Sequence, residues 1–272
     1  MTTYSISPTH LIGSLWRHAG LIRVSARREI LGRYQGSVLG LFWSFFNPLF
    51  MLAIYTFVFS VVFNARWGTG NDSRTEFALL LFAGLIVFNI FAECVTRAPT
   101  LITGHVGYVK KVVYPLEILP FVIMMSALFH GLVSLLVWSA AYLVLFGLPP
   151  LTALYLPIVL LPFLFFIMGL SWALAALGVF LRDIAQFVVS LTSMLMFLSP
   201  IFYPMSALPE NFRQIVLLNP LAIVIEMVRG VLYFGHQPDF VMLAMYWVAA
   251  LLSAWLGFAL FQKMRKGFAD VL

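Results

Sequence analysis

Long uncharged apolar runs, separated by short polar segments, set the pattern of this chain. Residues 118–181 contain no Asp, Glu, Lys or Arg, and this run is far longer than the roughly 20 residues that one bilayer crossing needs. It must therefore turn, and we expect the turn at Gly147-Leu148-Pro149-Pro150. Divided in this way, the runs predict six membrane-spanning helices, at residues 40–63, 77–96, 118–146, 151–180, 184–204 and 240–262.

The composition indicates that these apolar helices belong to a membrane protein. Apolar residues make up 62% of the 272 residues and charged residues only 10%, against about 45–50% and about 25% in soluble domains. A domain of this size cannot hide such an excess in one core, because much of its surface stays exposed. The composition excludes a soluble globular enzyme. It predicts an all-α integral membrane protein with a single transmembrane domain over residues 1–272.

The distribution of Lys and Arg predicts the orientation, because short cytoplasmic loops carry an excess of basic residues. Six spans put both termini on one side of the membrane. Twelve of the 16 basic residues lie on that side, namely Arg17, Arg23, Arg27, Arg28, Arg33, Arg97, Lys110, Lys111, Arg182, Lys263, Arg265 and Lys266. The other side holds four, Arg66, Arg74, Arg213 and Arg229. We therefore expect both termini in the cytoplasm, and the net charge of +6 indicates topology, not a nucleic-acid partner.

Residues 9–36 precede the first span and form a basic amphipathic pattern. In a helix, one arc of about 100° would hold the apolar side chains, namely Leu11, Leu15, Ala19, Ile22, Ala26 and Ile30. The basic side chains lie outside this arc, although Leu21, Val24 and Leu31 leave it as well. Such a helix beside a span is expected in the cytoplasmic interface of the membrane. The alternative is a solvated basic leader that only obeys the charge rule.

The predicted cytoplasmic loop at residues 97–117 is longer than a plain connector between helices, which usually has about 2–8 residues. Thr100 to Val109 is polar enough to leave the membrane and long enough for a two-turn helix, although Gly104 and Gly107 weaken that helix. We expect this loop to contact a cytoplasmic partner.

The chain between the fifth and sixth spans carries two apolar runs, Ile215–Leu218 and Leu221–Val231, that are too short to cross a bilayer. Prolines break the chain around them, in Ser199-Pro200-Ile201-Phe202-Tyr203-Pro204, at Pro209 and at Asn219-Pro220. Irregular backbone at membrane depth is tolerated only inside protein or along a wet cavity. We therefore predict a re-entrant outer region at residues 205–239 that caps the structure beneath it.

Few ionisable residues fall inside the spans, where they would be functional candidates. Glu93 precedes Arg97 by four residues, so a pair on one helix face accounts for it. His130 stands alone in the third span, without a partner carboxylate, which favours a packing role over a proton relay. No phosphate-binding loop, zinc-protease motif or nucleophile elbow is present, and Cys94 is the one cysteine. We expect no catalytic residue, no metal site and no cofactor bound by this chain.

Aromatic residues, 16% of the chain, offer the other candidate chemistry. Rings at membrane boundaries usually form an interfacial belt, and rings in mid-span usually pack against lipid or neighbouring helices. The alternative is a path for sugars, because ring faces pack on the apolar C–H face of a pyranose. The candidates for such a path are Trp43, Phe46, Tyr55, Phe59, Phe202 and Tyr203.

Four groups of short sequence motifs follow one another along the chain. They are Arg28 to Gly40 (REILGRYQGSVLG) with Trp43 and Asn47-Pro48, Lys110 to Pro120 (KKVVYPLEILP), Phe180 to Ile184 (FLRDI), and Ser199 to Pro204 with Leu208-Pro209 and Leu218 to Leu221. On a six-span chain, these strings resemble the ABC-2-type permeases that export polysaccharides, and most of all those for lipid-linked O-antigen or teichoic acid. Leu116 departs from the family, which often has Arg or Lys at this position.

The resemblance implies one half of a transporter that pairs with a second permease and with two ATP-binding cassette subunits, which would hold ATP and Mg²⁺. Residues 97–117 would be the coupling loop and residues 9–36 the gate helix. The implied contacts with the ATPase are Arg28, Glu29, Arg33, Thr100, Thr103, Gly104, His105, Tyr108, Lys110, Lys111, Arg182 and Asp183. The two permeases would enclose a channel past the six aromatic candidates, with the outer region as its gate.

The implied cargo is a polysaccharide on an undecaprenyl-diphosphate carrier, O-antigen above all, moved across the bacterial inner membrane. Basic residues at the cytoplasmic entrance suit a diphosphate, but membrane lipid head groups attract them equally. A capsule polymer, a teichoic acid, or a drug or lipid is an alternative cargo for the same fold. An alternative of another class is a membrane enzyme acting on lipid-linked sugars, for which only Glu93 and His130 are available.

Overall fold

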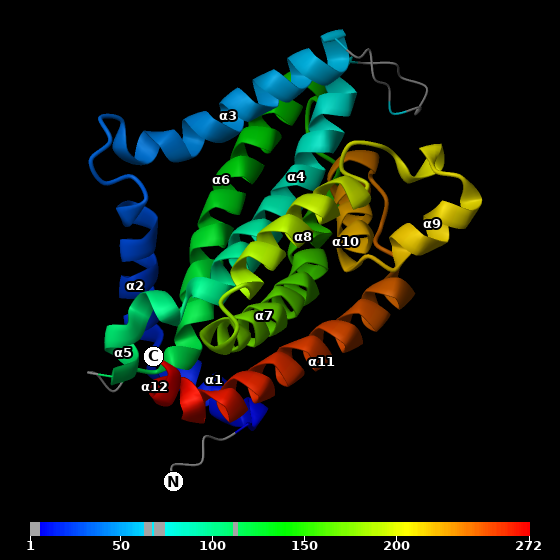
Figure 1. The fold of residues 1–272 in the computed structure, drawn as a ribbon. Coiled ribbons are helices and arrows are strands. Elements are labelled where there is room, and N and C mark those ends of the chain that lie inside the picture. Colours follow the sequence, from blue (N-terminus) through cyan, green and yellow to red (C-terminus); the bar gives the residue numbers. More distant parts are fainter. Residues whose placement is uncertain (1–5, 63–66, 68–73, 111–113) are drawn as a thin grey trace.

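The computed structural model describes residues 6–62, 67, 74–110 and 114–272. All regular structure in these residues is helical, with no β-strand among them. Five helical stretches in this part of the chain are long and apolar enough to cross a bilayer, Gly40–Phe59, Thr75–Thr100, Leu116–Phe146, Leu151–Phe180 and Phe240–Val271. The predicted all-α membrane class is confirmed. The first and last helices of the described residues, α1 and α12, lie at the same end of the bundle (Figure 1).

The α-helices follow one another in the order shown in Figure 1. Their bounds are α1 Pro8–Arg17, α2 Ala19–Gly32, α3 Trp43–Tyr55, α4 Arg74–Arg97, α5 Val106–Lys110, α6 Leu119–Phe146, α7 Leu156–Phe180, α8 Ile184–Leu198, α9 Glu210–Leu217, α10 Pro220–Arg229, α11 Phe240–Met264 and α12 Phe268–Val271. Two wider π-helical turns continue helices without a break, Thr56–Val62 after α3 and Gly230–Phe234 after α10.

Helix α4 forms the centre of the bundle and α3 its least covered edge. In the apolar stretch of α4, 83% of the residues are buried, whereas only 11% of those in the stretch containing α3 are buried. Figure 1 shows why: α4 lies among α6, α8 and α10, but α3 meets the bundle near its C-terminal end and diverges from α6 toward its N-terminal end. A wide apolar face of α3 is therefore left uncovered by this chain.

Helices α7 and α11 cross at a contact that only glycine permits. A Cβ atom at Gly257 would lie 2.0 Å from the backbone oxygen of Gly169, and one at Gly169 would lie 2.2 Å from the backbone oxygen of Ser253. Small residues let helix backbones approach closely, which is a common way of joining helices in membranes. The crossing holds α11 against the bundle along its middle.

The predicted turn between the third and fourth spans is confirmed. Gly147 follows the last residue of α6 with φ at 87°, a conformation that L side chains rarely adopt. Pro150 then leads into the helical turn Leu151–Tyr155, which continues as α7. The apolar run is thus divided where its Gly and Pro residues predict.

The predicted fifth span is shorter in the structure. Helix α8 has 15 residues, or about 22 Å, and ends at Leu198, where Ser199 turns to an extended backbone before Pro200. The stretch 199–204 therefore belongs to the outer region. There, Glu210–Leu217 and Pro220–Phe234 form a pair bent by 100°, which fits either the predicted re-entrant segment or a broken span. Asn219 lies at the bend and its side chain accepts a hydrogen bond from the Leu221 N–H, which starts α10.

Candidate functional site

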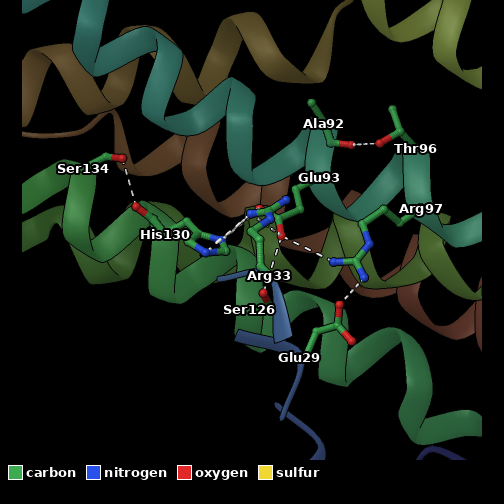
Figure 2. Close-up of polar contacts among 9 residues, drawn as sticks. All are labelled: Glu29, Arg33, Ala92, Glu93, Thr96, Arg97, Ser126, His130 and Ser134. Carbon is green, nitrogen blue, oxygen red and sulfur yellow. Dashed lines mark hydrogen bonds and ion pairs between the residues drawn. The ribbon is translucent and has the colours of Figure 1, made fainter. Parts of the chain in front are cut away.

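A polar cluster joins the N-terminal segment to two spans, α4 and α6 (Figure 2). Its centre is Glu93 on α4, whose side chain is 12% exposed. Arg33, which follows α2, lies 3.3 Å from the Glu93 carboxylate, and Arg97 lies 3.6 Å from it. His130 Nδ1 on α6 lies 3.1 Å from Glu93 Oε2. Glu93 is thus compensated by groups from three elements, as a largely buried carboxylate requires.

The cluster confirms one prediction and corrects another. The Glu93–Arg97 pair on one helix face is present as predicted. The prediction that His130 has no partner carboxylate is wrong, because Glu93, 37 residues earlier, lies in contact with it. The pattern within one helix cannot reveal a contact between two. His130 Nδ1 also lies 2.9 Å from Arg33 Nη1, so this nitrogen either donates to the carboxylate or accepts from the guanidinium.

Two further contacts extend the cluster along α2. Arg97 forms an ion pair with Glu29, one turn before the end of α2 (Figure 2). Tyr34 packs its ring edge-on against His130 at 6.1 Å, and burial raises the pKa of its hydroxyl although the Arg33 guanidinium opposes this rise. The apolar residues Ile22 and Ala26 in the middle of α2 pack on Ile118 and Val122. Helix α2 is thus held by apolar contacts in its middle and by ion pairs at its end.

The predicted coupling loop is a series of short helical turns rather than one two-turn helix. It contains the turns Ala98–Thr100 and Thr103–His105 and then α5. Thr103 Oγ1 donates to the Thr100 carbonyl at 3.1 Å, and such local side-chain bonds compete with a regular helix. The rings of His105 and Tyr108 stack at 5.1 Å. Lys111 lies outside the described residues.

The residues assigned to the ATPase contact lie on α2 and its C-terminal end, in the coupling loop and in the link between α7 and α8, and they differ in exposure. The exposed ones are Arg28, Arg33, Thr100, Gly104, Lys110, Arg182 and Asp183. The half-buried ones are Glu29, Thr103, His105 and Tyr108. Arg182 and Asp183 form the short link from α7 to α8. Glu29 and Arg33 already form ion pairs within the polar cluster, so a partner could contact only those of their atoms that remain exposed.

The six aromatic candidates fall into separate groups. Trp43 and Phe46 pack edge-on at 5.5 Å near the start of α3. Phe59, beyond the end of α3, stacks on Phe202 at 5.8 Å and lies 6.4 Å from Tyr55. Phe59 also stacks on Phe77 of α4. The Tyr203 hydroxyl donates to the carbonyls of Phe197 and Leu198, so this residue folds back on α8. Tyr55, Phe59 and Phe202 thus form one group of rings, and Trp43 and Phe46 form another.

Arg229 is a buried residue, which the sequence analysis counted only among the four basic residues on the side opposite the termini. Its side chain is fully buried, and its guanidinium donates to the backbone oxygens of Leu80, Pro200 and Ile201 and to Glu226. It also lies 4.4 Å from the centre of the Trp67 ring. Gly84 leaves room for it, because a Cβ there would lie 2.8 Å from Arg229 Nη2. Arg229 thereby fixes the outer region to α4. An arginine within an apolar run, three residues after a glutamate, is the signal that could have indicated it.

Glu117 is a second buried residue without a predicted role. Its side chain accepts hydrogen bonds from Ser14 Oγ at 2.8 Å and from Arg265 Nη1 at 2.6 Å. Its backbone oxygen accepts from Trp172 Nε1 at 2.9 Å. The carboxylate thus joins α1, the entrance of α6 and the segment after α11. A lone acidic residue at the start of a long uncharged run is the available sequence signal.

The helices long enough to cross a bilayer define a multi-pass membrane protein. Residues 20–233 match the model of the ABC-2 type transporter family, and the chain belongs to this family. The family resemblance of the sequence strings is therefore confirmed.

Named relatives align along nearly the whole chain. The O-antigen export system permease protein RfbA of Myxococcus xanthus is 27% identical over 262 residues, which are 96% of this chain and 98% of that protein. A protein of the same name from Klebsiella pneumoniae is 30% identical over 255 residues, 93% of this chain and 95% of its own. The polysialic acid transport protein KpsM of Escherichia coli is 25% identical over 248 residues, 88% and 91% of the two chains.

Proposed function

We propose that this chain is the permease subunit of an ATP-driven transporter that exports a polysaccharide on an undecaprenyl-diphosphate carrier, with O-antigen as the cargo. The observation that carries the proposal is the alignment with O-antigen export permeases over 96% and 93% of this chain. An alignment of that extent includes every helix of the bundle, which supports the same subunit role for this chain. The cargo named for these relatives, O-antigen, is therefore the first cargo that we expect for this chain.

ATP hydrolysis belongs to a separate subunit in this proposal. The sequence contains no G-x-x-x-x-G-K-[ST] loop to cradle phosphates. The coupling loop offers the surface for that subunit, since Thr100, Gly104 and Lys110 are exposed at the end of the bundle that holds the chain termini. Arg182 and Asp183 are exposed as well and complete the proposed contact. This assignment puts that end of the bundle in the cytoplasm of a bacterium, at its inner membrane.

The transport path lies between two copies of the chain in this proposal. Large apolar side chains of α3 and of the turn before it are exposed, with Phe42 at 60%, Phe45 at 45% and Phe50 at 54%. A second copy would cover them, and the aromatic groups around Trp43 and Phe59 would face the path. Ring faces suit the C–H faces of sugars. The basic residues Arg28 and Arg33 suit the diphosphate of the carrier at the entrance.

A capsule polymer is the second candidate cargo, because the polysialic acid transport protein is also a relative at 25% identity. The enzyme alternative is less well supported. Such an enzyme needs a carboxylate or histidine free to act, whereas Glu93 and His130 are engaged with each other and with Arg33. The drug or lipid alternative predicts stimulation of ATP hydrolysis by small amphiphiles.

Purification from the native membrane, followed by mass spectrometry of everything that co-purifies, tests the proposal. We expect an ATP-binding subunit in a one-to-one ratio and a polyprenyl-linked glycan, whose sugar composition distinguishes O-antigen from capsule. A chain that purifies with neither would contradict the proposal. An ATP-binding subunit without glycan, together with hydrolysis stimulated by amphiphiles, would support the drug or lipid alternative instead.

A further inference from the structure

Three aromatic rings form a continuous stack from the coupling loop, which includes α5, toward the bundle. His105 stacks on Tyr108 at 5.1 Å with an angle of 20° between the rings. Tyr108 stacks on Tyr114 at 4.3 Å and 10°. Tyr114 lies just before the turn Leu116–Ile118 that leads into α6, so the stack joins the coupling loop to the entrance of α6. Stacked rings in van der Waals contact move together, because sliding one of them forfeits the contact of its neighbours.

Tyr114 also contacts two other segments, α2 and the segment after α11. Its hydroxyl lies 3.4 Å from Ser25 Oγ on α2. Its backbone oxygen accepts a hydrogen bond from Arg265 Nη2 at 3.3 Å. Burial raises the pKa of the Tyr114 hydroxyl, so this group is protonated at neutral pH and stays available as a donor.

Glu117 completes the connection three residues later. Arg265 uses its other terminal nitrogen for the Glu117 carboxylate at 2.6 Å, so one guanidinium bridges Tyr114 and Glu117. The second carboxylate oxygen is bound to Ser14 of α1. Glu117 is only 4% exposed, and a buried carboxylate that loses one partner is left uncompensated in a low dielectric. The three segments are therefore not free to separate while this pair is intact.

We propose that Glu117 is a positioning residue for transport, and that with Arg265 and the His105–Tyr108–Tyr114 stack it forms a linkage carrying movements of α5 to α1 and α11. The proposal rests on the proposed function, in which α5 contacts the ATPase. Glu117 lies at the entrance of α6, inside the turn Leu116–Ile118, so the same movement also reaches a membrane span. Energetic coupling between sites travels through such contiguous packed and hydrogen-bonded groups.

The first experiment uses the full transporter with its ATPase subunit in proteoliposomes and measures glycan transported per ATP hydrolysed. We expect Arg265→Gln to lower this ratio about fivefold or more while ATP hydrolysis stays within about twofold of wild type. Arg265→Lys, which keeps the charge beside Glu117, should recover much of the ratio. Lys266→Gln is the matched control, because it removes a neighbouring exposed cation and should leave the ratio unchanged.

A second pair of variants tests the ring stack. Tyr114→Leu removes the ring while keeping an apolar side chain of similar reach, and it should lower the same ratio. Tyr114→Phe keeps the ring, loses only the contact with Ser25, and should behave like wild type. Hydrolysis and transport that fall in parallel in Arg265→Gln and Tyr114→Leu, or a ratio that does not change, would overturn the linkage.

A third measurement needs no ATPase and separates this inference from the proposed function. Spin labels at Ile12→Cys on α1 and Lys110→Cys on α5, both exposed positions, report the distance between the two helices in a Cys94→Ala background. Glu117→Gln should broaden the distance distribution, and Lys266→Gln should not. Equal distributions in the two variants would overturn the linkage even if the transporter is active. A broadened distribution in a chain that never binds an ATPase would refute the proposed function alone.

Discussion

Arg33, at the end of α2, lies 3.3 Å from the carboxylate of Glu93, which stands 60 residues later on the central helix α4. This contact ties a helix that the sequence places outside the spans to the most buried span of the bundle. Because Arg97 and His130 share the same carboxylate, Glu93 is the group through which α2, α4 and α6 are joined.

The Glu93 cluster should stabilise the fold. Glu93→Gln removes the charge that compensates Arg33, Arg97 and His130, and we expect it to lower the free energy of unfolding by about 1–3 kcal/mol. Thermal unfolding in detergent measures the change as a lower Tm. Asp270→Asn is the control, since Asp270 is exposed and its loss should change stability by less than about 0.5 kcal/mol. Equal losses in the two variants would show that the cluster does not stabilise the fold.

The glycine crossing of α7 and α11 should not tolerate a methyl group. Gly257→Ala puts a Cβ 2.0 Å from the Gly169 oxygen, so the helices must separate, at a cost of about 1–3 kcal/mol or more. Gly20→Ala on α2 meets no atom within 4 Å and should stabilise its helix by about 0.5–1 kcal/mol. Opposite shifts of Tm in the two variants are expected. A neutral Gly257→Ala would mean that α11 is not packed at this distance.

Arg229 should hold the outer region in place. Arg229→Met keeps much of the volume but leaves the carbonyls of Leu80 and Ile201 without their donor, each at a cost of about 1–3 kcal/mol. We expect faster proteolysis within residues 199–239 and a lower Tm. The matched control is Arg213→Met, because Arg213 is exposed and donates to the nearby carbonyls of Met205 and Leu208. Proteolysis that is equally fast in the two variants would contradict the anchoring role.

The stack of Phe59 on Phe202 should be measurable as a coupling energy. In a double-mutant cycle with Phe59→Leu and Phe202→Leu, we expect an interaction of about 0.5–1.5 kcal/mol in the free energy of unfolding. A second cycle pairs Phe59→Leu with Phe180→Leu, because the Phe180 ring packs against Phe268 of α12, away from Phe59. This second pair should be additive within about 0.5 kcal/mol. Additive effects in both cycles would show that the Phe59–Phe202 contact contributes no interaction energy to folding.

The architecture was largely predictable, because crossing a bilayer demands long apolar runs and turning demands residues such as Gly147 and Pro150. The end of α8 was less so, since residues after Ser199 remain apolar although Pro200 breaks the helix. The polar site could not be predicted in this way, because it is formed by contacts between residues of different helices. The partners of Glu93 and His130 lie on other helices, and Arg229 and Glu117 find theirs across 149 and 148 residues.

The burial of Arg229 has a consequence for the order in which the chain is made. The groups that receive its guanidinium, from Trp67 and Leu80 to Ile201 and Glu226, all precede it in the sequence. A ribosome therefore releases every acceptor before the charge itself emerges. An arginine held in an apolar interior without acceptors carries a large desolvation cost. Synthesis from the N-terminus spares the nascent chain that cost, because Arg229 enters a pocket whose walls have already been translated.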